Sequence, residues 1–182
     1  MIDDELFGIL EPTLFPLGFA TEDGEDHRDP PLDVLRFYRR PVRLHWTPLL
    51  GRAQGVVAVV RQPVDIAGTE AGCRTLLDRL ARAVNSRFPP SWTLGFGSIG
   101  LTAVVLTPEP ITIDDDAPLV ASLKAPLRSR VIPLAIVRLN LGQEAMSFGL
   151  AGGPDGLFPE PDALLDALTN KFRRFVPTIE WD

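Results

Sequence analysis

The clearest element predicted by the hydrophobic pattern is a long amphipathic helix over residues 69–88. Its apolar positions recur at the spacing of one helical face, and they are Cys73, Leu76, Leu77, Leu80, Ala81, Val84 and Phe88. Thr69 has the side chain of an N-cap residue, and Pro89 and Pro90 end the helical pattern. We therefore expect this helix to pack one face on the core.

Other segments carry the patterns of β-strands, and these are residues 36–46, 55–60, 92–106, 131–141 and 145–150. In the first segment polar and apolar residues alternate on either side of Arg39–Pro41, which predicts a strand with one buried face. The run GVVAVV at 55–60 is apolar throughout, as is typical of a central strand. Residues 140–144 (NLGQE) are expected to join the last two segments as a hairpin.

Shorter helices are predicted near both ends of the chain. Residues 3–10 begin with acidic side chains and have an apolar face, and Pro12 is expected to kink or end the helix. A C-terminal helix is expected over about residues 161–175, with cationic residues in its last turn. We interpret residues 21–33 as an acidic loop and residues 151–160 as a Gly/Pro loop.

The resulting order is helix, strands, long helix, strands, helix. Because long helices do not alternate with single strands, this order predicts an α+β fold with a mainly antiparallel sheet. The long amphipathic helix would be central, with the N- and C-terminal helices packed on the sheet. A length of 182 residues fits one α+β domain spanning residues 1–182.

Composition excludes several kinds of site. The chain has one cysteine, Cys73, and two histidines, His27 and His45, so cysteine-based and three-histidine metal sites lack their ligands. We predict no metal and no other cofactor. The acidic N-terminus does not fit a secretory signal, and no apolar run is long enough to span a membrane. A cytoplasmic protein is therefore expected, and the excess of Arg over Lys is typical of GC-rich bacterial genomes.

Charge is divided unevenly along the chain, whose net charge is −6. Residues 1–33 contain ten acidic residues and one Arg, whereas residues 34–87 contain ten Arg and three acidic residues. We therefore expect the acidic loop 21–33 to fold near the arginines of the strand at 36–46.

Three features resemble known functional sites, but in each the pattern favours a structural role. Gly95–Gly100 has the G-x-G-x-x-G spacing of a dinucleotide site, but a β segment follows instead of the required helix. Ser98 is preceded two residues earlier by Phe96, where the G-x-S-x-G pattern of a nucleophile elbow needs glycine. Asp114–Asp116 have no calcium-loop spacing, and Asp116 is expected to cap a short helix at 117–124. No catalytic residue is predicted.

The segment 36–46 (RFYRRPVRLHW) is the strongest candidate binding site because it combines basic with aromatic side chains. The period of a strand places alternate residues on one face. Arg36 and Tyr38 should therefore share a face, and so should Arg43 and His45. The predicted partner-binding residues are Arg36, Tyr38, Arg43, His45 and Trp46. Such side chains can also neutralise phosphates and stack on bases, but the acidic net charge disfavours a nucleic-acid partner.

The element order, small size and low pI of about 4.9 are similar to those of secretion-chaperone-like α+β domains. This resemblance implies a domain that dimerises and binds a partner polypeptide. We therefore predict a non-enzymatic protein-binding domain that forms a homodimer. Two alternatives stay open, which are a small hydrolase centred near Ser98 and Asp114–Asp116, and a nucleic-acid-binding domain that uses the strand 36–46.

Overall fold

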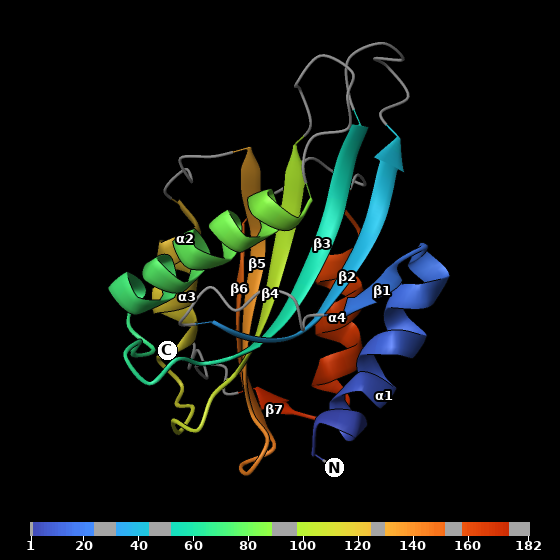
Figure 1. The fold of residues 1–182 in the computed structure, drawn as a ribbon. Coiled ribbons are helices and arrows are strands. Elements are labelled where there is room, and N and C mark those ends of the chain that lie inside the picture. The colour runs from blue at the N-terminus through green and yellow to red at the C-terminus, as the bar shows by residue number, and fades with distance from the viewer. Residues whose placement is uncertain are drawn as a thin grey trace, which may run out of the picture.

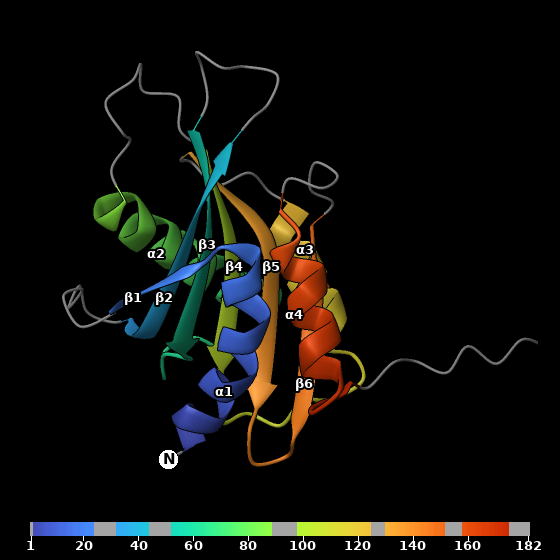
Figure 2. The same ribbon diagram turned by 90° about the vertical axis from the view of Figure 1, so that its right-hand side faces the viewer.

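The chain forms a seven-stranded β-sheet with helices on both faces (Figures 1 and 2). The computed structural model describes residues 2–23, 32–43, 52–88, 98–124, 130–151 and 158–174. The predicted α+β class is confirmed. None of the described helices combines the length and the apolar composition that a membrane crossing requires.

The described part of the chain begins with a helix and ends with a short strand. In chain order, the elements are α1 (Ile2–Leu14), a 3₁₀ helix (Phe15–Leu17), β1 (Ala20–Asp23), β2 (Asp33–Arg43), β3 (Arg52–Arg61), α2 (Glu70–Arg87), β4 (Ile99–Leu106), α3 (Asp116–Lys124), β5 (Val131–Asn140), β6 (Ala145–Leu150), α4 (Glu160–Thr169) and β7 (Arg173–Arg174). The predicted hairpin is present as β5 and β6, which pair antiparallel.

The sheet is mixed, which corrects part of the fold prediction. Its strands lie in chain order, and β3, β4 and β5 run parallel at its centre. The pairs β2–β3 and β5–β6 are antiparallel as predicted, whereas β6–β7 is parallel. The pair β1–β2 is also antiparallel, but β1 occupies residues that the sequence assigned to the start of the acidic loop 21–33, because its backbone pairs with the edge of β2. The parallel centre arises because α2 connects β3 to β4 and α3 connects β4 to β5, each as a crossover between parallel strands.

Helices cover the sheet on both sides and divide the apolar core into two parts. α2 and α3 pack on one face, and α1 and α4 pack on the other (Figure 2). All eight residues of β4 are buried, because helices lie over both faces of the central strands. The long helix is therefore a cover for one face of the sheet.

The long helix follows its predicted pattern closely. The hydroxyl oxygen of Thr69 accepts a hydrogen bond from the backbone N–H of Gly72 at 3.2 Å, which confirms the N-cap. The predicted apolar stripe is buried along its whole length. Phe88 follows the helix and meets Phe37 of β2 edge to face, with ring centres 5.7 Å apart.

The helices near the chain ends depart from their predicted bounds. α1 continues past Pro12 to Leu14. α4 ends at Thr169, so the C-terminal cations do not form its last turn. Instead, Arg173 and Arg174 pair with β6 as the short strand β7, and Arg173 N–H donates to the carbonyl oxygen of Glu144 at 2.6 Å. Backbone bonding to a strand edge has replaced the extra helical turn.

Candidate functional site

The α1-facing side of β2 is covered at two residues of the predicted binding segment 36–46. Arg36 and Tyr38 share this face of β2, as predicted. The Arg36 guanidinium lies 2.5 Å from the Glu11 carboxylate and stacks 3.8 Å from the centre of the Phe7 ring, both on α1. Tyr38 is completely buried in the core beneath α1. These two side chains therefore serve the packing of α1 on the sheet.

The other face of β2 carries Arg39, which pairs with an acidic residue as the charge pattern predicts. Its Nε lies 2.9 Å from Glu22 Oε1, and its guanidinium lies 5.3 Å from the Phe88 ring centre. Glu22 also lies 3.8 Å from Nε of Arg87 on α2. The expected approach of the acidic stretch 21–33 to the strand arginines is confirmed at Glu22.

The remaining predicted contact residues cannot be placed with the first two. The side chain of Arg43 lies outside the part of the chain that the structure describes, as do His45 and Trp46 entirely. Partner binding by the set of five residues therefore stays a prediction.

The residues of the hydrolase alternative do not come together in the described stretches. Ser98 is exposed at the start of β4, whereas Asp114–Asp116 lie beyond the loop that leaves the far end of this strand. Asp116 has a structural role, because Oδ1 accepts the Phe148 N–H at 2.7 Å and Oδ2 lies 2.8 Å from the Arg174 guanidinium. Among the described residues, no group of three or more Asp, Glu, His or Cys side chains can bind a metal ion.

The described part of the glycine-rich motif has a packing role. Gly100 lies inside β4, and no helix follows it. A Cβ at this position would lie 2.6 Å from Cε1 of Phe158 and 2.7 Å from Cδ1 of Leu134. Glycine at this position lets the side chains of Phe158 and Leu134 approach the backbone closely.

We expect Gly100→Ala to lower the free energy of unfolding by about 1–3 kcal/mol, since the added methyl group overpacks the core. Gly8→Ala is the matched control, because a Cβ at this position in α1 meets nothing within 4 Å. The control should stabilise the protein by about 0.5–1 kcal/mol through helix propensity. Urea unfolding of both variants measures the difference, and equal effects would contradict the packing role of Gly100.

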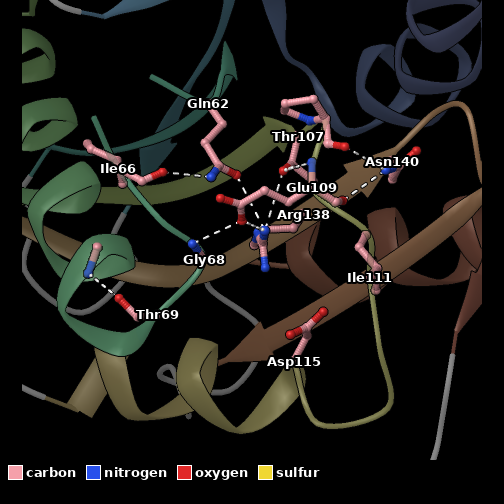
Figure 3. A network of polar contacts seen from close by, with 12 residues as sticks. Gln62, Ile66, Gly68, Thr69, Thr107, Glu109, Ile111, Asp115, Arg138 and Asn140 are labelled. Carbon is pink, nitrogen blue, oxygen red and sulfur yellow. Dashed lines mark hydrogen bonds and ion pairs between the residues drawn. The ribbon is translucent and has the colours of Figure 1, made fainter. Parts of the chain in front are cut away.

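A polar cluster that the sequence patterns did not predict lies at the carboxyl ends of the three parallel strands (Figure 3). Gln62 follows β3 and Thr107 follows β4, while Arg138 and Asn140 lie near the end of β5. The loop after β4 adds Glu109. In open sheets with parallel strands, ligands bind at this edge because the connecting loops begin there.

Arg138 is the centre of the cluster and is only 3% exposed. Its Nη2 lies 2.6 Å from Oε2 of Glu109, and it also contacts Oγ1 of Thr107 at 3.3 Å and Oε1 of Gln62 at 3.4 Å. One guanidinium nitrogen thus contacts groups from the ends of β3 and β4. The hydrogen bond to the carboxylate is the shortest of the three, as expected when both groups are charged.

The loop before α2 approaches this guanidinium through a glycine. Gly68 donates its backbone N–H to Oε2 of Glu109 at 3.1 Å, so this oxygen accepts from both Gly68 and Arg138. A Cβ at Gly68 would collide with the Arg138 guanidinium. Since Gly68 precedes the N-cap residue Thr69, the carboxylate lies near the N-terminus of α2, where the helix dipole favours negative charge.

Side-chain amides fix the position of the Glu109 loop. Asn140 Nδ2 donates to the Glu109 carbonyl oxygen at 2.8 Å, and its Oδ1 accepts the Gln143 N–H at 2.9 Å. Gln143 Oε1 in turn accepts the Ile111 N–H at 2.9 Å. These bonds hold the backbone on both sides of the Glu109 carboxylate without using the carboxylate itself.

The cluster has hydrogen-bonding capacity that the described residues leave unused. Arg138 Nε is buried without a partner among them, and so is Oγ of Ser147. These two residues are directly opposite each other on β5 and β6, so their side chains share one face of the sheet. Buried polar atoms are nearly always satisfied in folded proteins. The cluster can therefore accept a further polar group.

Cys73 lies in the first part of α2 and is 3% exposed. Burial raises the pKa of its thiol, and the positive charge of Arg138 opposes part of this increase. The thiol is therefore protonated at neutral pH and is a poor nucleophile. This outcome agrees with the structural role predicted for Cys73 from the apolar stripe.

Comparisons with protein-family models, with curated proteins and with solved structures found no match to this chain. The resemblance to secretion-chaperone-like domains concerns only the order of elements along the chain. In this chain α3 lies between β4 and β5, within the second group of strands. The geometry around Arg138 is therefore the basis for a functional proposal.

Proposed function

We propose that this protein is a non-enzymatic binding domain and that the Arg138 cluster receives an anionic group of its partner. The observation that carries the proposal is the pairing of a guanidinium that is 3% exposed with a Glu109 side chain that is 40% exposed. The buried Arg138 charge is thus separated from solvent by the Glu109 carboxylate, which is itself partly exposed. The site lies at the sheet edge where connecting loops form binding sites.

Stability alone is a weak reason for a buried ion pair at this position. Desolvating the charges offsets much of their attraction, and apolar residues of similar volume often serve the fold equally well. The neighbouring atoms Arg138 Nε and Ser147 Oγ are also unsatisfied among the described residues. Recognition of an anion accounts for both observations, because a guanidinium offers five donors to a carboxylate or phosphate.

The described residues support binding more than catalysis. The Cys73 thiol is held protonated by burial, and Ser98 is remote from Asp114–Asp116 along the chain of elements. We keep another protein as the proposed partner, as the sequence predicts, but place the contact at Arg138 instead of on the strand 36–46. Homodimerisation and a cytoplasmic location stay predictions.

We expect acetate or inorganic phosphate to shift the backbone amide resonance of Gly68 saturably in an NMR titration. Arg138→Met should weaken this binding roughly 10- to 100-fold, because a charge-assisted hydrogen bond is lost. Arg138→Lys keeps the charge but not the planar fork, and it should give an intermediate loss. Arg82→Met removes the same charge from an exposed site on α2 and should leave the affinity unchanged.

Two results would overturn the proposal. One is equal affinity of the wild-type protein and Arg138→Met for the anions that bind. The other is no saturable binding either to the wild-type protein or to a variant in which Glu109 is neutral. Urea unfolding of Arg138→Met shows whether lost binding reflects lost folding.

A further inference from the structure

We infer that the ligand group at Arg138 is a single carboxylate on an apolar body, and that Glu109 occupies its place in the unbound protein. This inference rests on the binding function proposed for the Arg138 cluster. It adds the chemical class of the ligand and the internal group with which that ligand competes.

Glu109 already shows that a carboxylate fits the site. Its Oε2 accepts from the Arg138 guanidinium at 2.6 Å and from the Gly68 N–H at 3.1 Å (Figure 3). The absence of a side chain at Gly68 lets the loop backbone approach the guanidinium. The two donors and the N-terminus of α2 therefore form a receptor for one negatively charged oxygen.

The internal carboxylate uses this receptor incompletely. Among the described residues, the hydrogen bonds of Arg138 all come from Nη2, and Nε has no partner. Carboxylates bind arginine best through two parallel hydrogen bonds. An external carboxylate is not tied to the loop as Glu109 is, so it can orient both oxygens toward the guanidinium, which favours exchange.

The Glu109 side chain can leave without opening the core. It is 40% exposed, whereas its loop is fixed through backbone groups by Asn140 and Gln143. Rotation of this side chain into water therefore frees the receptor while the loop stays in place. No rearrangement of the sheet is needed.

The loops around the receptor favour an apolar ligand with one charge. Val64 is fully exposed on the loop before α2, and Ile113 is 42% exposed on the loop before α3. Asp65 on the first loop is paired with Arg79 at 2.8 Å, whereas the second loop carries the carboxylates of Asp114 and Asp115, which would repel a phosphate dianion or a strongly acidic peptide. A carboxylate on an aliphatic body agrees with both features.

Such a carboxylate can come from a small aliphatic acid or from the free C-terminus of a polypeptide that ends in an apolar residue.

The probes that test this inference are octanoate, acetate, 1-octanol and inorganic phosphate, together with a short peptide ending in Val-Leu as the free acid or the amide. Binding is measured by calorimetry and by the Gly68 amide resonance. The proteins are the wild type, Glu109→Gln, Arg138→Met and Asp166→Asn, which removes a negative charge from an exposed site on α4.

We expect octanoate to bind more tightly than acetate, 1-octanol or phosphate. Glu109→Gln should bind octanoate roughly 10- to 100-fold more tightly than the wild type, because a charged internal competitor is removed. Asp166→Asn should match the wild type, and Arg138→Met should lose the binding. Tighter binding of the free-acid peptide than of octanoate assigns the ligand to a polypeptide terminus, and the reverse order assigns it to a small acid.

Equal octanoate affinity in Glu109→Gln, Asp166→Asn and the wild type would overturn the competition by Glu109. Equal affinity for acetate and octanoate, or tighter binding of phosphate, would overturn the assigned ligand class. Either result leaves anion binding at Arg138, and thus the proposed function, intact. Failure of every probe with both the wild type and Glu109→Gln overturns the proposed function as well.

Discussion

Replacing Phe37 by alanine is expected to lower the free energy of unfolding by about 3–5 kcal/mol, the usual cost of removing a buried aromatic ring. Phe37 is completely buried between β2 and α2, and it contacts the Phe88 ring edge to face at 5.7 Å. The substitution removes apolar burial and leaves a cavity beneath the end of α2. Urea unfolding followed by circular dichroism measures the loss.

Phe15→Ala is the matched control for this experiment. Phe15 lies in the 3₁₀ helix after α1 and is 47% exposed, so its loss should cost at most about 1 kcal/mol. Similar losses in the two variants would contradict the placement of Phe37 in the core. That placement distinguishes the two faces of β2, since Phe37 packs toward α2 while Tyr38 packs toward α1.

Arg40→Met is expected to lower the free energy of unfolding by about 3 kcal/mol near pH 8, because it leaves a buried carboxylate without its cationic partner. Glu160 is completely buried at the start of α4, and its Oε2 lies 3.3 Å from Arg40 Nη2. Its Oε1 has no hydrogen-bond partner within the described chain. The pair joins α4 to β2 at the α1-facing side of the sheet.

The loss in Arg40→Met should shrink as the pH falls. Burial raises the pKa of the Glu160 carboxyl, with Arg40 and the Glu160 backbone opposing part of the increase. The folded state therefore binds a proton more readily than the unfolded state, so stability falls as the pH rises from the ordinary glutamate pKa through the raised folded value. Protonation of Glu160 as the pH falls removes the buried negative charge and with it the need for Arg40.

Unfolding titrations near pH 5 and pH 8 test this dependence in the wild type, Arg40→Met, Glu160→Gln and the double variant. In Glu160→Gln, the free energy of unfolding should no longer fall with rising pH through the titration of this side chain. The double variant should recover most of the stability that Arg40→Met loses near pH 8. An equal loss in Arg40→Met at both pH values would contradict the role of the Glu160 charge.

The sequence pattern and the tertiary contacts point to different candidate sites. The strand 36–46 stood out because its cations and aromatic residues are adjacent in the chain, yet α1 and Glu22 account for Arg36, Tyr38 and Arg39. Arg138 was a weaker signal in the sequence, because it is a single cation in a mostly apolar strand. Its partners Gln62 and Glu109 lie 76 and 29 residues away, so no local spacing joins them.

The sequence by itself determined the elements whose signals are local. The three- and four-residue apolar spacing and the Thr69 cap defined α2, because helical faces and caps are formed by near neighbours. The alternation and apolar runs located the strands β2 to β6, and the turn residues after Asn140 located the β5–β6 hairpin, whereas the short edge strands β1 and β7 lie where a loop and a helix were predicted. The structure confirmed these elements and the α+β class.

Only the tertiary structure decided which strands pair and where charged groups meet. The parallel centre follows from the crossovers through α2 and α3, although the apolar runs of β3, β4 and β5 were a sign of strands buried on both faces. Parallel pairing brings the carboxyl ends of distant segments to one edge, and this placed Glu109 and Gly68 around Arg138. Strand pairing is non-local, so the site that it creates has no contiguous motif.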